Sequence, residues 1–202
     1  MSEKSTAFLP GSVHELAASP KQQWELGQVR QIAAGRLTPE GALTATGTTE
    51  THWQLSIRSV EKPGRFDTGG LRHILTLIAG DFLQLVIDGA AQGVEPLRPA
   101  ALDSSSPIET SQPTEELLLL HLAHDPQQVR STVRIVELSR KREQYLFDGQ
   151  LGVLLQGQAT VVSHNQEAEA NPRDTVVGGD AAEVRLSGRG VLAVISVDHP
   201  GS

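Results

Sequence analysis

HILTLIAG (residues 73–80) and FLQLVIDG (residues 82–89) are the part of the sequence that decides the fold class. Each run is short, rich in Leu and Ile, and closed by a glycine, as expected of buried β-strands that end in turns. We predict that the two runs pair with each other through a tight connection at Gly80-Asp81.

Similar runs lie on both sides of this pair. In WQLSIRSV (residues 53–60) apolar and polar residues alternate, which is typical of a half-buried strand. Three further runs have the same character: STVRIVEL (131–138), LGVLLQGQATVV (151–162) and VLAVISV (191–197). Helical signal is sparse, with Ser12 and Glu15 as the capping pair of one short helix ending before Pro20. Many short strands with few helices predict an all-β sandwich or barrel.

The composition excludes several classes of protein. The 202 residues include 17 basic and 24 acidic ones, for a net charge of −7, and no cysteine. This balance argues against binding to a nucleic-acid backbone, and the run Arg140-Lys141-Arg142, beside Glu137 and Glu143, predicts a solvated turn. The absence of cysteine rules out disulfides and thiol chemistry. Since no apolar run is long enough for a membrane span or a secretory signal, we expect a soluble cytoplasmic protein without membrane or nucleic-acid partners.

One shift aligns several landmarks of the chain with later ones. Gly80 and Gly157 each close an apolar run and are 77 residues apart, as are Asp103 and Asp180. The same shift relates these further pairs: Leu77 and Leu154, Ile78 and Leu155, Leu117 and Val194, and Leu120 and Val197. We therefore predict a duplication, with 1–43 as an N-terminal extension whose strands complete the body, 44–121 as the first unit and 122–198 as the second.

The order of strands, glycines and turns resembles that of a cupin barrel. Four segments resemble the HutD/Ves family of histidine-utilisation-linked and stress-induced bicupin proteins: WQLSIRSVEKPGRF (53–66), LRHILTLIAG (71–80), PLRPAALD (96–103) and VRIVEL (133–138). The resemblance covers residues 24–197. It implies an all-β bicupin of two cupin-like barrels (an RmlC-like jelly roll) with few short helices, small-molecule binding, and a part in controlling histidine breakdown.

The family's N-terminal pattern is only partly kept. The segment WELGQVRQIAAG (24–35) retains Trp24, Gly27, Arg30 and Ile32. It differs where the family has Asn, Thr and Glu, at Leu26, Val29 and Gln31. The fold inference therefore stands on more residues than any inference about the ligand.

Metal-dependent cupins resemble one another in placing His-x-His and a Glu ahead of the strand glycine, and a further His after the next turn. Counting back from Gly80, these positions hold Asp67, Gly69 and His73, and the corresponding positions before Gly157 hold Gln144, Leu146 and Gln150. One carboxylate and one imidazole do not make a transition-metal site. His121 and His124, three apart on a strand, would face opposite sides, with one inward and one near solvent. We therefore expect neither a metal nor another cofactor.

The candidate ligand-binding residues are cationic, aromatic or hydroxyl-bearing. His73 would point into the barrel with Leu75 and Leu77, either as a pocket residue or as a core histidine bonded to a backbone carbonyl. Arginines are suited to pairing with a carboxylate, because the guanidinium presents a fixed fork of donors. The full set of candidates is Trp24, Arg30, Trp53, Ser56, Arg58, Arg72, His73 and His121.

These observations predict a metal-independent bicupin that binds a small polar, anionic metabolite and senses or governs a catabolic step of the histidine-utilisation type. No catalytic residue is assigned. Two alternatives stay open: a cupin isomerase or lyase that uses His73 as general acid or base, and a structural or interaction protein whose pocket has closed. A homodimer is possible for a protein of this architecture.

Overall fold

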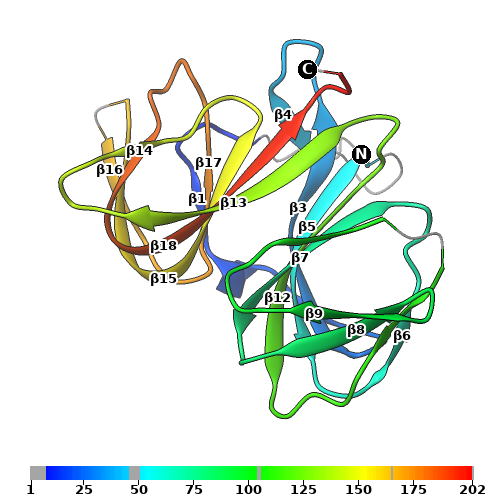
Figure 1. Cartoon of the computed structure of the whole chain (residues 1–202). Helices are drawn as coiled ribbons and strands as arrows, with labels where there is room; N and C mark the ends of the chain where they lie inside the picture. The colour runs from blue at the N-terminus through cyan, green and yellow to red at the C-terminus, as the bar shows by residue number, and fades with distance from the viewer. Residues whose placement is uncertain (1–7, 46–50, 104–105, 165, 202) are drawn as a thin grey trace. The chain divides into compact units, whose positions relative to one another are not determined.

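The computed structural model describes residues 8–45, 51–103, 106–164 and 166–201 and is built almost entirely of β-strands (Figure 1). The chain divides into two units, one made of residues 19–33 and 53–127 and the other of residues 1–18, 34–52 and 128–202. Strand β3 (Gly27–Leu37) begins in the former unit and ends in the latter. We call them the histidine unit and the C-terminal unit.

The histidine unit contains two sheets. In the first, the strand order is β10-β7-β12-β5-β3-β2, and in the second it is β6-β11-β8-β9. Besides β3, the strands are β2 (Lys21–Trp24), β5 (Trp53–Val60), β6 (Gly64–Phe66), β7 (Arg72–Ala79), β8 (Leu83–Ile87), β9 (Ala90–Val94), β10 (Ala100–Leu102), β11 (Ile108–Thr110) and β12 (Leu117–His124).

The C-terminal unit is built around two long antiparallel strands, β15 (Gln150–Ser163) and β18 (Arg185–Asp198). The strand order of its sheet is β1-β17-β15-β18-β13, with β14 paired to β18 and β16 to β15. The other elements are β1 (Val13–His14), a 3-10 helix (Leu16–Ala18), β4 (Leu43–Ala45), β13 (Arg130–Leu138), β14 (Gln144–Tyr145), β16 (Gln166–Ala170) and β17 (Thr175–Val177). The predicted short helix is thus a single 3-10 turn.

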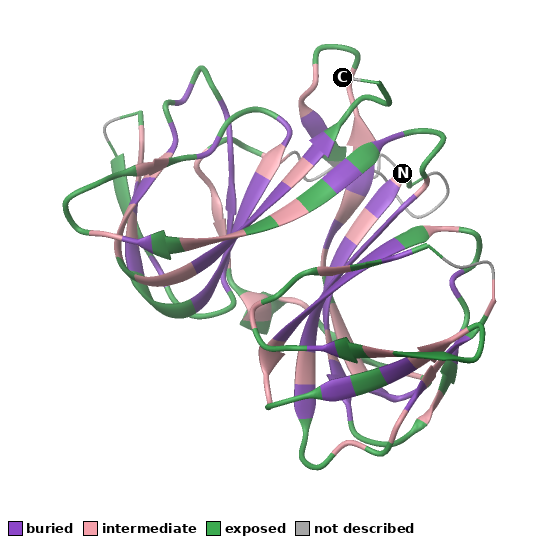
Figure 2. Cartoon of the chain, viewed as in Figure 1, coloured by how far each residue is buried: buried purple, intermediate pink, exposed green. Residues whose placement is uncertain are grey.

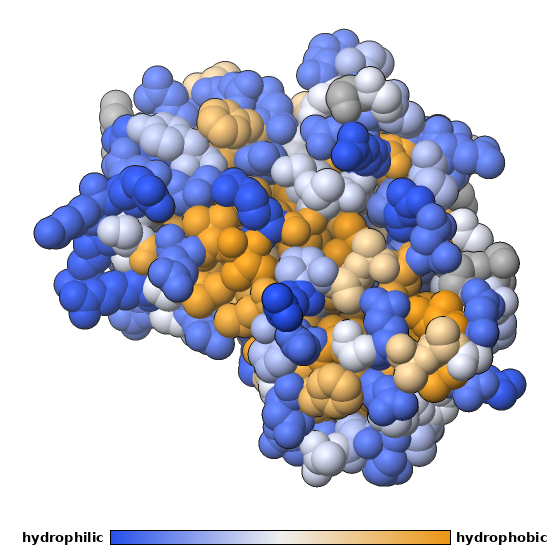
Figure 3. Space-filling view, viewed as in Figure 1, coloured by the Kyte–Doolittle hydropathy of each residue, from blue (hydrophilic) through white to orange (hydrophobic). Residues whose placement is uncertain are grey.

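Each unit has its own apolar core, and Figure 2 shows the buried residues concentrated on the strands. Leu75, Leu77 and Leu119 belong to the core of the histidine unit, and Leu154 and Leu192 to that of the C-terminal unit. Burying one such side chain contributes about 1.5–3 kcal/mol. Hydrophilic residues lie around the margins of the visible face of each unit, and hydrophobic residues show between them (Figure 3). Among the described residues, the first and last strands of each sheet's strand order do not pair with each other, so the sheets are open. Two closed barrels therefore remain a prediction.

The predicted pairing of residues 73–80 with 82–89 is wrong. Strand β7 pairs with β10 and β12, whereas β8 lies in the other sheet and pairs with β9 and β11. The hairpin forms one turn later, at Asp88-Gly89, where both residues have positive φ (51° and 80°). An Asp-Gly pair with two positive φ angles matches the twist of a two-residue hairpin, and the left-handed Gly80 (φ 95°) marks the end of β7 instead.

The two segments related by the 77-residue shift share an irregularity in strand register. Ile78 is skipped in the register between β7 and β12, and Leu155 is skipped in the register between β15 and β18. Gly80 and Gly157, two residues beyond, both have positive φ (95° and 88°). The shift does not extend to the last strand. Leu77 lies opposite Leu119 and Leu154 opposite Leu192, and these partners are 73 residues apart, so the matches of Leu117 with Val194 and Leu120 with Val197 are wrong.

Candidate functional site

A polar cluster lies on one face of the sheet in the histidine unit, on the neighbouring strands β5, β7 and β12. Directly opposed residues of antiparallel strands point to the same side of a sheet. The cross-strand pairs that fix this face are Arg58–Leu119, Ser56–His121, Leu75–His121 and His73–Ala123. Because Leu75 and Leu119 belong to the apolar core, the polar side chains share the core-facing side of the sheet. As the spacing predicts, His73 lies on this side with Leu75 and Leu77.

The two histidines of the cluster are hydrogen-bonded to each other. The distance from His73 Nδ1 to His121 Nε2 is 2.6 Å, and His73 Nε2 lies 2.9 Å from the carbonyl oxygen of Thr68. A carbonyl oxygen can only accept, so the neutral His73 ring carries its proton on Nε2. His73 Nδ1 is then an acceptor, and the bond between the rings is donated by His121 Nε2. The proton positions follow from this hydrogen-bond assignment.

Both imidazoles are held in the neutral form. Burial lowers the pKa of His73, the bond to the Thr68 carbonyl opposes this effect, and the positive charge of Arg58 lowers the pKa further. Burial also places the pKa of His121 well below its ordinary value, with further lowering by Arg58 and His73. His73 is 4% exposed and His121 2% exposed, which leaves little solvation for a charged ring.

Arg58 is the cation of the cluster. Its Nε donates to Ser56 Oγ at 3.1 Å, and its guanidinium carbon lies 5.0 Å from the centre of the Trp24 ring. Trp24 is fixed in turn by a 2.8 Å hydrogen bond from its indole N–H to the Ser59 carbonyl. Within the described residues, the two Nη groups of Arg58 have no hydrogen-bond or ion-pair partner. Burial lowers the pKa of Arg58 and the Glu25 carboxylate raises it, and the guanidinium remains charged at neutral pH.

An aromatic side chain closes the other side of the cluster. Phe66 lies between Trp24 and His73, with ring centres 5.8 Å from the first and 6.3 Å from the second. Phe66 is 5% exposed and belongs to the apolar core. The charged Arg58 and the neutral histidines therefore lie against apolar surface, where an electrostatic contact is stronger than in water.

Three predicted site residues are not part of this cluster. Trp53 and Arg72 lie opposite His124 on the other face of the sheet. The Arg72 guanidinium pairs with Asp103 at 2.5 Å. Arg30 lies on β3 and donates to the carbonyl of Ser19. Of the eight predicted residues, the structure brings together Trp24, Ser56, Arg58, His73 and His121.

The expectation for His121 and His124 is partly corrected. The two side chains do face opposite sides of β12, as three-residue spacing on a strand requires. His124, however, is not near solvent, because it is 1% exposed. Burial lowers the pKa of His124, Arg72 and His73 lower it further, and Asp125 raises it.

The residues of the cluster do not fit the transition-metal site found in many cupins. Among the described residues, no three His, Asp or Glu side chains gather in one group. The two cluster histidines share a hydrogen bond at 2.6 Å. Two nitrogens bound to the same tetrahedral ion, each at about 2.1 Å, would lie roughly 3.4 Å apart. The imidazoles are therefore arranged to share a proton, and no carboxylate completes a ligand set.

Three groups that shape the cluster were not predicted from the sequence: the Thr68 carbonyl, the ring of Phe66 and the carboxylate of Glu25. The position of a backbone carbonyl in a turn cannot be predicted from the side chains, and Phe66 has the pattern of an ordinary core residue. Alternation in residues 53–60 did place Ser56 and Arg58 together, but as the solvent side of a half-buried strand. Ser56 is 5% exposed, so β5 is buried on both faces near the cluster.

The fold is that of a cupin-type all-β protein. The HutD family profile matches residues 16–194, and the chain therefore belongs to the HutD family, a group related to histidine utilisation. HutD from Pseudomonas fluorescens is similar in structure, with a TM-score of 0.73, 20% identity, and coverage of 94% of this chain and 99% of that one. A conserved protein of unknown function from Pseudomonas aeruginosa gives a TM-score of 0.76 at 16% identity, over 93% and 98% of the two chains.

A cupin 2 conserved barrel domain protein from Leptotrichia buccalis is a more distant structural neighbour, with a TM-score of 0.53 and 6% identity over 88% of this chain and 92% of that one. No curated protein matches the sequence. The part of the chain that the structure describes contains no helix with the length and apolar character of a membrane span.

Proposed function

We propose that the histidine unit binds a small carboxylate-bearing metabolite, without a metal, and that binding reports the level of a catabolic intermediate. The observation that carries this proposal is Arg58, a half-buried cation whose Nη groups have no partner among the described residues. A guanidinium held against aromatic and apolar surface is most stable when an anion accepts its free N–H donors.

The groups around Arg58 favour a small anion that is a single carboxylate or a short carboxylic acid. The Trp24 ring and the Ser56 hydroxyl hold Arg58 in place, so little side-chain freedom is lost when an anion binds. The His121 imidazole lies close enough to Arg58 for their charges to interact. A carboxylate that contacts Arg58 would therefore also favour protonation of the histidine pair.

Binding without turnover is supported by the state of His73. Both of its ring nitrogens already have partners, the Thr68 carbonyl and His121, so the ring is not free to exchange protons with a substrate. Membership of the HutD family makes anionic intermediates of histidine breakdown the first ligands to examine. Formate is a further probe, because the similar HutD structure from Pseudomonas fluorescens is described in a formate condition.

The test is isothermal titration calorimetry of the whole protein with urocanate, N-formylglutamate and formate. We expect saturable binding of at least one of these anions, weakened about tenfold or more by Arg58→Gln, since a charge-assisted hydrogen bond is lost. Arg65→Gln removes the same charge from an exposed residue that pairs with Glu109, and should leave binding unchanged. Absence of binding by all three anions to the folded protein would contradict the proposal.

A further inference from the structure

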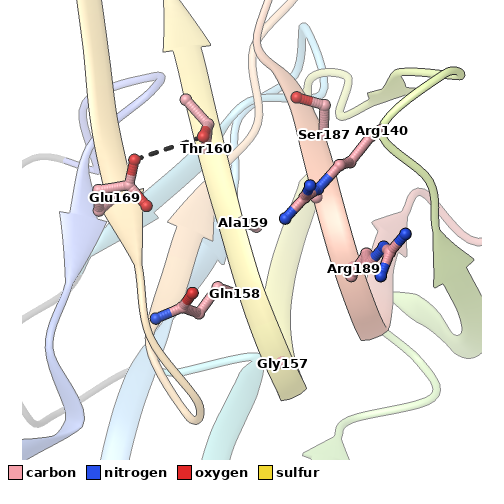
Figure 4. A pocket seen from close by; sticks show the side chains of 9 residues that line it. Arg140, Gly157, Gln158, Ala159, Thr160, Glu169, Ser187 and Arg189 are labelled. Carbon is pink, nitrogen blue, oxygen red and sulfur yellow. Dashed lines mark hydrogen bonds between the residues drawn. The ribbon is translucent and has the colours of Figure 1, made fainter.

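A polar pocket lies in the C-terminal unit, on strands other than those of the histidine cluster. It has a volume of about 750 Å³ and is formed by β15, β16, β18 and the turn that follows β13 (Figure 4). Its lining residues are Arg140, Gly157, Gln158, Ala159, Thr160, Glu169, Ser187, Gly188 and Arg189. A volume of this size admits a small metabolite.

Polar side chains share one face of the sheet in this pocket. The cross-strand pairs are Gln158–Arg189, Thr160–Ser187 and Thr160–Glu169. Opposed residues point the same way, so all five side chains lie on the side away from Ala159, which is buried in the core. The register thus brings amide, hydroxyl, guanidinium and carboxylate groups from three strands to one surface.

Two arginines supply positive charge to this surface. Arg189 comes from β18, and Arg140 comes from the turn after β13 and reaches over β18 toward β15 (Figure 4). Within the described part of the chain, neither guanidinium has an ion pair or a hydrogen bond. The carboxylate of Glu169 lies on β16 and accepts a 3.4 Å hydrogen bond from Thr160 Oγ1, so the one acidic side chain among the described lining residues is engaged away from the arginines.

The floor of the pocket is backbone. Gly157 lies opposite Gly190, and a Cβ atom on Gly157 would collide with the carbonyl of Arg189. A Cβ atom on Gly188 would likewise meet the backbone of Gln158 and Ala159. Glycine therefore lets β15 and β18 approach closely, and the strands that carry the arginine and the hydroxyl groups are held in a fixed arrangement.

We infer that this pocket is a second binding site, for a small polar metabolite that carries a carboxylate or phosphate group. The guanidinium forks of Arg140 and Arg189 bind the oxyanion, and Gln158, Thr160 and Ser187 bind its hydroxyl groups. Glu169, at the other side of the pocket, accepts a hydrogen bond from a donor at the far end of the ligand and disfavours a second anionic group there. The site is independent of the Arg58 cluster and of the function proposed for it.

The test is calorimetric titration of the whole protein with inorganic phosphate, gluconate and citrate. Phosphate and gluconate separate a phosphate from a carboxylate head group, and citrate, with several carboxylates, should bind more weakly than gluconate because of Glu169. We expect saturable binding of phosphate or gluconate, weakened tenfold or more in the double variant Arg140→Gln/Arg189→Gln. The variant Arg142→Gln changes the same charge in the same turn outside the pocket and should bind as the unchanged protein does.

Three results would overturn the inference: no saturable binding of any of the three probes, equal binding by the double variant, or equal loss in Arg142→Gln. Binding that disappears in Arg58→Gln but survives in the double variant would assign the probe to the histidine cluster and also overturn it. Loss of binding in Arg58→Gln to urocanate, N-formylglutamate or formate bears on the first proposal alone, so the two proposals fail separately.

Discussion

His73 and His121, 48 residues apart in the chain, are joined by a 2.6 Å hydrogen bond between Nδ1 of the first ring and Nε2 of the second. The planes of the two rings are 20° from parallel, with their centres 4.8 Å apart. The Thr68 carbonyl fixes the tautomer of His73, so His121 Nε2 donates the hydrogen bond between the rings. While that bond keeps its direction, a further proton can be taken up only at Nδ1 of His121. The pair is therefore a single site for one proton, close to Arg58.

The buried pair makes the stability of the histidine unit depend on pH. The pKa of each ring is lowered in the folded protein, so the unfolded chain binds more protons as the pH falls below about 6.5. Stability is thus greatest above pH 6.5 and is lost as the pH falls toward the folded-state pKa values. At pH 5.5 the loss is at most about 1.4 kcal/mol for each histidine, the limit for a ring that stays neutral in the folded protein, and His121, whose pKa is lowered further, should lie nearer that limit than His73.

This prediction can be measured by urea unfolding at pH 8.0, 6.5 and 5.5, followed by the fluorescence of Trp24 and Trp53, which both lie in the histidine unit. His121→Asn removes one of the buried rings and should flatten the dependence on pH even if it lowers stability at every pH. Equal slopes for the two proteins would show that the pair does not control the acid sensitivity.

Binding of an anion beside Arg58 should be linked to proton uptake. A carboxylate partly cancels the positive charge that lowers the pKa of His73 and His121, so both pKa values rise when the anion binds. Affinity should therefore increase as the pH is lowered from 7.5 to 6.0. Titrations in two buffers of different ionisation enthalpy measure the protons taken up, and heats independent of the buffer would argue against the linkage.

Gly157 should tolerate substitution less well than another left-handed glycine. Gly157 and Gly89 have similar φ angles of 88° and 80°, but a Cβ atom on Gly157 meets the backbone of β18, whereas nothing lies within 4 Å of one on Gly89. Gly89→Ala should cost about 1 kcal/mol for the backbone conformation alone. Gly157→Ala should cost about 3 kcal/mol or more, because two strands must also separate.

Thermal or denaturant unfolding of the two alanine variants gives this comparison directly. Both substitutions carry the same conformational penalty, so the difference between them isolates the close approach of β15 and β18. If the two variants lost the same stability, the contact at Gly157 would have no energetic importance.

The equivalent leucines of the two cores should have similar energetic roles. Leu77 and Leu154 are both fully buried, one in each core cluster. Replacement of either by Ala removes buried apolar surface and leaves a cavity, with an expected cost of about 2–5 kcal/mol. Leu9→Ala, at a side chain that is 64% exposed, should cost less than about 0.5 kcal/mol. Denaturant unfolding curves of the three variants check the ranking, and a cost for Leu154→Ala as small as that for Leu9→Ala would contradict it.

Much of the fold was predictable from local pattern. The period of two in residues 53–60 predicts β5 with its observed bounds, and the long runs at 131–138 and 151–162 match β13 and β15 within two residues. The glycines at 80 and 157 were recognised as equivalent, and the structure gives both a positive φ. The partner of β8 was not predictable in this way, because an apolar run indicates a strand without indicating which strand lies beside it.

The order of residues along the chain is enough to predict a β-protein of the HutD family. It also predicts that Ser56 and Arg58 share one face of their strand, because side chains alternate along any strand. Which residues of other strands meet that face depends on how the strands pair in the folded protein. Register between strands depends on bulges and turns far apart in the chain, and a shift of one residue exchanges the two faces. For that reason His73 and His121 join Arg58, while Arg72, the immediate neighbour of His73, lies on the opposite side and pairs with Asp103.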